Sequence, residues 1–574
     1  MRRYNTPAVS IMRRQVISNP PPPFFSRCTI QWQIALLERV GRIMRWNVVL
    51  PAVGGDGEER DAFVKTRVLE WIGKPQTKYI ILVLGMVFLG TSLIWDLGAN
   101  VDIYHVLNTG RFIWENGFTR EEPFSMHEGL SYLPQQWLSA AIFYAVWSVS
   151  GYLGLAIFLY LILAVAVWVA VLAGCMQSGS KVGTVHVVVA ILVFLPLCLT
   201  VGFRPRVFDA LAFSCTMYLI QKARIQKDAR YLVPIPFLSC ALINLHASMW
   251  PIIFMVGGGF FLAALVRKEF RFAGRLALTG AASAVVLLCN PYGIDAVLYI
   301  FRSMSPLITQ YIGECQPLIE FWFSLVGVGP YFAFVSIVII LIVVGLALSI
   351  VFVRRGDIWL PVLWAIFAAF ALWSFRNSFF VLLVVLALAS QWASVFFRDE
   401  KSRFDGNVVL PVGLSLVFLF SGFFASPLVK GRSAYEIVES NSGAFIVEDA
   451  MPRFGKEVSD LDVYAYDGSY LEFAYRIPCY YDGRAEVFLE SLNGRSEIRG
   501  EIVGLGRRED QGRTVSFDDE SLRSFIEKYW FDYLVLSNGG LDDAIDTHLM
   551  HAAEGLGYQT VYEDEGRKVM ARPE

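Results

Sequence analysis

The chain of 574 residues is 55% hydrophobic and 14% aromatic, with only 17% charged residues and a mean hydropathy of +0.50. Soluble globular chains carry about 25% charged residues, so this composition excludes an ordinary soluble protein and indicates an integral membrane protein. The formal net charge of -2 gives no basis for binding nucleic acid.

The first 77 residues differ in kind from the rest. They carry twelve Lys and Arg residues, a Pro-rich run NPPPPFF and no apolar stretch long enough to cross a bilayer. The continuous apolar segment of a signal peptide is also missing from them. We expect residues 1–77 to form a partly disordered cytoplasmic N-terminal tail.

Eleven apolar segments within residues 78–426 are candidate membrane spans, because a helix needs about 20 mostly apolar residues to cross a bilayer. The fold class predicted is therefore an α-helical polytopic membrane protein with about 11 transmembrane helices. The segments are Tyr79–Trp95, Tyr152–Ala173, Thr184–Gly202, Val207–Ile220, Tyr231–Met249, Ile252–Val266, Leu276–Cys289, Tyr331–Val353, Ile358–Phe375, Phe379–Phe397 and Val408–Phe424.

A further apolar run begins at Gln136, between the first two segments, and loop charge decides its placement. Basic loops collect on the cytoplasmic side, and the four here are 221–230, 266–275, 353–357 and 397–404. All four lie inside only if this run does not cross. We therefore predict that Trp137–Val149 is an interfacial helix on the outer surface, with Trp137, Tyr144 and Trp147 as aromatic anchors. A missed span elsewhere is the alternative.

This topology places the N-terminus inside and residues 427–574 outside, as an extracytoplasmic α/β domain. Short apolar runs in it have the character of strands: GAFIVE (443–448), DVYAY (462–466), CYYDG (479–483) and DYLVLS (532–537). Helical patterns occupy 520–529 and 542–556. Strands mixed with helices in this order favour an α/β unit.

Polar residues near the span ends gather on the predicted outer face. Ionisable groups at a span are costly to insert, so they are functional candidates. Asp102, in the loop 97–151 after the first span, faces a set contributed by four later segments. The candidates are Asp96, Asp102, Arg204, Arg206, Asn244, His246, Asn290, Tyr292 and Arg376.

Structural roles compete with functional ones at several of these positions. Asp96 also suits the solvated end of a helix, and NPYG (290–293) is a helix stop signal. A lone histidine such as His246 is commonly a satisfied structural residue. Arg204 and Arg206 in the Arg-Pro-Arg turn suit either interface anchors or an anion site.

A carboxylate opposite several guanidinium groups suits transfer from a phosphate leaving group. The carboxylate accepts the proton of an attacking hydroxyl, and guanidinium and imidazole groups stabilise the growing phosphate charge. At a membrane surface such a donor is a sugar on a polyprenyl phosphate. No Gly-rich loop of the kind that cradles a nucleotide phosphate is found. The eight cysteines are scattered and lack the spacing of a metal site. We therefore predict no bound cofactor and no metal ligands, and leave open whether the reaction needs a divalent cation.

A series of short motifs resembles the GT-C superfamily of polytopic glycosyltransferases, and most closely a set of largely uncharacterised bacterial membrane proteins assigned to it. They occur in family order over about 78–574. The motifs are DIYHVLNTGRFIWENG (102–117), EPFSMHEG (122–129), QWLSAAIFYAVWSVSGYLGL (136–155), FRPRVFDALAF (203–213), INLHASMW (243–250), NPYG (290–293), DGSYLEFAYRIPCYYDGRAEVF (467–488) and YWFDYLVLS (529–537).

The resemblance implies a catalytic acidic residue in the first outer loop, at Asp102, together with juxtamembrane helices in that loop. Glu122 stands where the family usually has Asp, and Gln136 where it often has Glu or His. We take Asp102 and Glu122 as the catalytic candidates, and Arg204, Arg206, His246 and Arg376 as the donor-phosphate candidates.

The function that follows is an inverting glycosyltransferase in the bacterial inner membrane. It would use a polyprenyl-phosphate-linked sugar and a glycan, lipid or protein acceptor at the outer face, among membrane lipids. The alternatives are a transporter or flippase of lipid-linked glycan and a non-catalytic membrane scaffold. A transporter predicts internal repeats, and no clear repeat is found.

Overall fold

The computed structural model describes residues 102–178, 182–303, 313–326, 329–396, 434–465, 468–482, 484, 487–488, 506–508, 515–517, 519–537, 543–564 and 566–573. The predicted N-terminal tail, Asp96 and the predicted spans Tyr79–Trp95 and Val408–Phe424 lie outside the described residues.

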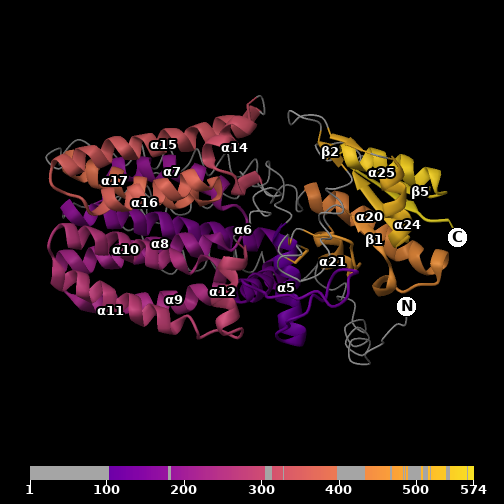
Figure 1. Cartoon of the computed structure of the whole chain (residues 1–574), viewed down its shortest axis with the longest axis horizontal. Helices are drawn as coiled ribbons and strands as arrows, with labels where there is room; N and C mark the ends of the chain where they lie inside the picture. The colour runs from indigo at the N-terminus through magenta and orange to yellow at the C-terminus, as the bar shows by residue number, and fades with distance from the viewer. Residues whose placement is uncertain are drawn as a thin grey trace, which may run out of the picture.

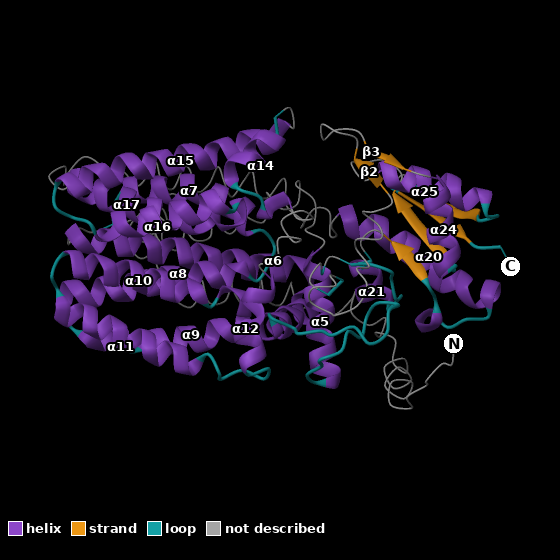
Figure 2. Ribbon diagram, viewed as in Figure 1, coloured by secondary structure: helices purple, strands orange, loops and turns teal. Residues whose placement is uncertain are grey.

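The larger part of the molecule is a bundle of roughly parallel and antiparallel helices, and a smaller part contains a sheet (Figures 1 and 2). The bundle helices are α5 (Asp102–Asn116), α6 (Trp137–Cys175), α7 (Thr184–Val201), α8 (Arg206–Gln226), α9 (Pro234–Leu245), α10 (Pro251–Val266), α11 (Phe270–Val286), α12 (Ile294–Ser303), α14 (Leu318–Ser324), α15 (Gly329–Arg354), α16 (Trp359–Trp373) and α17 (Ser378–Phe396).

Nine of the predicted spans coincide with helices in this bundle. Four described helices are long and apolar enough to cross a membrane: Gly154–Cys175, Ala247–Val266, Tyr331–Arg354 and Phe375–Phe396. Shorter apolar helices occupy Val185–Val201, Ala229–Leu245 and Trp359–Trp373. A multi-pass membrane protein is thereby supported, and the total of about 11 spans stays a prediction.

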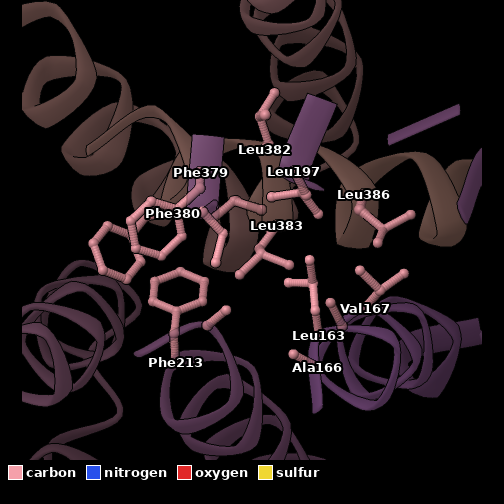
Figure 3. Close-up of a cluster of buried hydrophobic side chains, with 14 of the residues drawn as sticks. Leu163, Ala166, Val167, Leu197, Phe213, Phe379, Phe380, Leu382, Leu383 and Leu386 are labelled. Atoms are coloured by element: carbon pink, nitrogen blue, oxygen red, sulfur yellow. The ribbon is translucent and has the colours of Figure 1, made fainter. Parts of the chain in front are cut away.

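Helix α17 is the central helix of the bundle. Its side chains from Phe379 to Leu388 are at most 1% exposed, and Figure 3 shows Phe380, Leu383 and Leu386 meeting residues of α6 and α8. In Phe375–Phe396, 78% of the apolar window is buried, against 28% in Tyr331–Arg354. An apolar helix buried on all sides belongs to a core, whereas α15 presents an apolar outer face suited to lipid.

The segment predicted as an interfacial helix forms the first part of α6. Gly151 has φ 64° and ψ -165°, which breaks the helical path before Gly154–Cys175. A glycine adopts this positive φ without steric cost, so the two parts of α6 take different directions. The predicted aromatic anchors make protein contacts: Trp137 donates Nε1 to Asn244 Oδ1 at 2.9 Å, and Trp147 meets Phe473 edge to face at 4.8 Å.

The sheet carries strands in the order β1-β4-β6-β5, with β1 parallel to β4 and the other pairs antiparallel. Its strands are β1 (Val463–Ala465), β4 (Tyr533–Ser537), β5 (Gln559–Glu563) and β6 (Arg567–Ala571), and a separate hairpin joins β2 (Gly506–Arg508) to β3 (Val515–Phe517). The accompanying helices are α20 (Ala434–Phe454), α21 (Ser469–Tyr475), α24 (Asp519–Tyr529) and α25 (Asp543–Gly555).

Two strand predictions in this part were confirmed and two were wrong. DVYAY and DYLVLS contain β1 and β4, and the predicted helices are α24 and α25. The run GAFIVE lies inside α20, where Ile446 and Ala450, four residues apart, are both buried. A short apolar run does not distinguish a strand from a buried helix segment. CYYDG contributes only an isolated bridge, between Val463 and Cys479.

Candidate active site

The first element of the site joins the loop after the first predicted span to the turn between α7 and α8. Asp102 is the first residue of α5, and Arg204 lies in the turn that follows Gly202. Arg204 Nη2 is 2.5 Å from Asp102 Oδ2. The side chains of Arg204 and Asp102 are 20% and 29% exposed, so the pair is partly shielded but reachable from outside.

A carboxylate from a later loop extends this pair into a chain of ionic contacts. Glu314 belongs to the short 3₁₀ turn Gly313–Cys315. Its Oε2 accepts a hydrogen bond from Arg204 Nη1 at 2.8 Å and one from Arg206 Nη2 at 3.3 Å. Arg206, which opens α8, is 2% exposed and also donates Nη1 to the Thr200 carbonyl at 3.0 Å. Arg204 is therefore shared between Asp102 and Glu314.

The turn between α16 and α17 brings the third arginine to the same place. The Phe375 N–H donates to the Gln316 carbonyl at 3.0 Å, and the Phe375 ring stacks on Phe321 at 4.7 Å. These contacts hold the turn Phe375–Asn377 against the segment that carries Glu314. Arg376 Nη1 lies 3.7 Å from Cys315 Sγ.

Charge at this cluster is unbalanced toward the positive side. Burial alone would raise the pKa of Glu314, but three guanidinium groups outweigh burial and hold that pKa well below its usual range; they belong to Arg204, Arg206 and Arg376. These groups face two carboxylates, an excess of one positive charge. The Nε atoms of Arg206 and Arg376 are buried with no hydrogen-bond partner among the described residues. The arrangement suits an anion with several acceptor oxygens, such as a phosphate.

The same electrostatics act on Arg204. Burial lowers the pKa of its guanidinium, and the attraction of Asp102 and Glu314 more than reverses that effect and raises it. Arg204 is therefore permanently charged and keeps two acidic side chains from the first and a later loop together.

Glu122, predicted to support Asp102, lies in a different cluster of contacts from Asp102 and Arg204. Its carboxylate accepts from the Phe124 and Ser125 N–H groups at 2.8 and 2.9 Å, from Ser125 Oγ at 2.6 Å and from Arg484 Nη2 at 2.7 Å. The side chain is fully buried. Both carboxylate oxygens accept hydrogen bonds from structural partners, and Glu122 joins the segment between α5 and α6 to the C-terminal part of the chain.

His246 forms a buried pair with a residue that sequence reasoning passed over. Its Nδ1 lies 2.7 Å from Asp209 Oδ2, and the two side chains are 5% and 0% exposed. Asp209 follows Arg206 by three positions on α8, so both side chains lie on one face of that helix. No described contact joins His246 directly to the arginine cluster.

Asn244 and Asn290 form hydrogen bonds with backbone groups, and Tyr292 packs against another aromatic ring. Asn244 Nδ2 donates to the Cys240 and Cys289 carbonyls at 2.8 and 2.9 Å. Asn290 donates Nδ2 to the Leu287 and Gly293 carbonyls and accepts from the Tyr292 N–H at 2.8 Å. The Tyr292 ring is buried and meets Phe118 at 6.0 Å. The stop-signal interpretation of NPYG is thus the one that the geometry supports.

Two acidic residues of the candidate site were missed, although the sequence carried a signal for each. Asp209 is an ionisable residue inside the predicted span Val207–Ile220, which by itself marks a functional candidate. Glu314 lies between the spans that end at Cys289 and begin at Tyr331, a loop that the predicted topology places on the outer face. Among the described residues, no group of three or more His, Cys, Asp or Glu side chains forms a metal site.

Comparison with known proteins yields a fold relationship. No family model and no curated protein matches the sequence. The chain is similar to the crystal structure of the Archaeoglobus fulgidus oligosaccharyltransferase in the apo form, with a TM-score of 0.50 and 14% identity over 87% of this chain and 74% of that chain. The same archaeal protein, AglB, in complex with an inhibitory peptide and a dolichol-phosphate aligns with a TM-score of 0.48 and 11% identity over 87% and 74% of the two chains. The first likeness supports a GT-C-type fold, as the motif series predicts.

Proposed function

We propose that this chain, which has a GT-C-type fold, is a membrane glycosyltransferase. It transfers a sugar from a polyprenyl-phosphate-linked donor to a glycan, lipid or protein acceptor at the outer face of the membrane. The observation that carries the proposal is the chain of contacts Asp102–Arg204–Glu314, which unites a carboxylate of the first loop with the arginine cluster. The fold likeness to an oligosaccharyltransferase supports the same reaction class.

In the proposed reaction an acceptor hydroxyl or amide attacks the anomeric carbon of the donor sugar. The new bond forms as the bond from the anomeric carbon to the phosphate oxygen breaks, and its electron pair stays on the phosphate. Asp102 takes the acceptor proton. Attack from the face opposite the leaving group inverts the anomeric configuration.

The guanidinium groups act on the leaving group. Arg204, Arg206 and Arg376 would hold the donor phosphate and stabilise the negative charge that it gains, which is the contribution expected of preorganised cations. Glu314 keeps Arg204 and Arg206 in one orientation through its two hydrogen bonds. Asp209 fixes the His246 ring through Nδ1. With a proton on both ring nitrogens, the Nε2–H group would donate to a phosphate oxygen.

The test is sugar transfer in isolated membranes or proteoliposomes supplied with polyprenyl-phosphate-linked sugars. Removing the base through Asp102→Asn should lower kcat by roughly 10²–10⁴-fold, the contribution typical of acid–base catalysis. Arg376→Gln should weaken use of the donor. The matched control is Asp295→Asn, because Asp295 makes a more exposed ion pair with Arg120 at 2.8 Å. Unchanged transfer by the Asp102 variant would remove Asp102 from the mechanism.

A further inference from the structure

A recess lies between four helices of the bundle, and none of its wall residues belongs to the arginine cluster. Its volume is about 250 Å³, and its wall is built from α8, α9, α10 and α11, with Ile220, Ile235, Gly257, Gly258, Leu276 and Gly280 among the wall residues. Ile220 follows Arg206 by 14 positions on α8, which corresponds to about 21 Å along the helix. The recess is therefore separate from the candidate active site.

The recess is almost wholly apolar, and no described helix fills it. A methyl group added at Gly257, Gly258 or Gly280 would meet nothing within 4 Å. Its volume is below the roughly 300–1,000 Å³ of pockets that hold drug-sized ligands. An apolar slot of this size, on helices that lie among membrane spans, accommodates one hydrocarbon chain better than a sugar.

Two hydroxyl groups are the polar side chains of the wall, and they differ in their hydrogen bonding. Thr279 Oγ1 donates to the Arg275 carbonyl at 2.9 Å. Ser283 is 1% exposed, and its Oγ has no hydrogen-bond partner among the described residues. The recess thus contains one buried polar atom that its own walls leave unsatisfied.

Two exposed basic side chains lie on α11 next to the recess. Arg275 precedes the wall residue Leu276, and Arg271 lies one turn earlier on the same face of α11. Neither makes an ion pair within 4 Å among the described residues, although the charge of Arg275 adds to the Arg230 hydrogen bonds in lowering the pKa of Asp228. The neighbouring turn supplies exposed Lys227 and Arg230, although Arg230 is paired with Asp228 at 2.8 Å. Like charges four residues apart on a helix repel each other, so an anion between Arg271 and Arg275 would stabilise this end of α11.

We propose that the recess binds one acyl chain of an anionic glycerophospholipid, whose phosphate lies against Arg271 and Arg275. The basic loops 221–230 and 266–275 are those that the topology prediction places inside, and the cytoplasmic leaflet carries the anionic lipids. The apolar recess would bind the acyl chain of the lipid, and Arg271 and Arg275 would bind its phosphate. The site is independent of the proposed catalytic reaction.

The full-length protein would be reconstituted in nanodiscs that contain phosphatidylglycerol, phosphatidylcholine or an equal mixture of the two. After release from the nanodiscs, the lipids that stay bound to the protein would be measured by native mass spectrometry. Wild type should retain phosphatidylglycerol in preference to phosphatidylcholine. The double variant Arg271→Gln/Arg275→Gln should reduce phosphatidylglycerol retention about 30-fold, because each basic residue near an anionic surface contributes about 1 kcal/mol. Gly257→Phe, which fills the slot, should remove retention of both lipids.

Matched controls separate the recess from general surface effects. Gly274→Leu adds a side chain on α11, at a position where an added methyl group also meets nothing within 4 Å but which lies outside the recess wall. Arg354→Gln removes an exposed charge from another basic loop. Both should retain lipid as wild type does. Gly280→Leu fills the slot from α11 and should remove retention as Gly257→Phe does. Equal retention of the two lipids by wild type, or full retention by either glycine variant, would overturn the proposal.

Discussion

Arg484 provides the most demanding test of how the C-terminal part is joined to the segment between α5 and α6. Its guanidinium is 1% exposed and contacts two fully buried carboxylates, Asp482 through Nε at 2.8 and 3.0 Å and Glu122 through Nη2 at 2.7 Å. It also lies over the rings of Phe124 and Tyr132 at 5.0 and 5.1 Å. Arg484→Met keeps much of the apolar stem but leaves both carboxylates without their cation.

The expected loss is large because neither carboxylate has access to water. Removing one partner of a buried ion pair costs about 3–5 kcal/mol. For a folding unit of 150–250 residues, this corresponds to a fall in Tm of roughly 6–20 °C. Glu122→Gln in the Arg484→Met background should recover part of the loss, since it removes one of the two uncompensated charges.

The assay is thermal unfolding of the purified full-length protein, followed by intrinsic fluorescence and by protease cleavage between the bundle and the C-terminal part. The control is Arg453→Met, because Arg453 forms a partly exposed pair with Asp449 at 2.6 Å, four residues away on α20. Pairs of this kind contribute about 0.3–0.5 kcal/mol. Equal Tm values for the Arg484 and Arg453 variants would refute the reasoning, as would an additive effect of the second substitution at Glu122.

Further outcomes concern pH and helix contact. Glu472 is buried, and burial together with the charge of Asp482 raises the pKa of its carboxyl well above the usual range. The neutral form is therefore favoured in the fold, and the free energy of unfolding should fall as pH rises above about 4.5, by up to about 1.4 kcal/mol per pH unit. Glu472→Gln should flatten the dependence of Tm on pH. Glu314→Gln should weaken donor use in the transfer assay, as a raised KM for the lipid-linked sugar, because Arg204 and Arg206 lose the shared negative charge that orients them. An unchanged KM would argue against a phosphate site there. A methyl group at Gly110 would lie 2.1 Å from the Ala140 carbonyl oxygen. Gly110→Ala should therefore separate α5 from α6, lower the free energy of unfolding by roughly 1–3 kcal/mol and reduce sugar transfer. The control Gly274→Ala should change neither stability nor transfer.

Local pattern determined most of the helical architecture. Runs of apolar residues of near-bilayer length predict spans directly, because the lipid environment requires continuous internally bonded helices. Nine predicted spans accordingly coincide with described helices. Short strands were less predictable: β1 and β4 were identified, whereas the run 443–448 belongs to α20 because its buried face pairs residues four apart.

The sequence predicted which side of the membrane the site residues share, but it did not predict which of them contact one another. Topology alone assigned Asp102, Arg204, Arg206 and Arg376 to one side, since the sign of loop charge orients every span at once. Which of these residues meet was not encoded locally. Arg204 contacts Asp102 across 102 positions of sequence and Glu314 across 110, and such contacts depend on how whole helices pack.

Composition and periodicity by themselves determined a multi-pass membrane protein with acidic and basic groups near its span ends, because hydrophobicity and charge act residue by residue. Only the tertiary structure decided which carboxylate is buried in a structural ion pair and which stays accessible at the candidate site. Glu122 and Asp102 both lie in the predicted loop 97–151, yet folding buries Glu122 against Arg484 and leaves Asp102 partly exposed beside Arg204. The same folding brought in Glu314 and Asp209, since a buried charged group is costly without a partner, and their partners here come from distant segments of the chain.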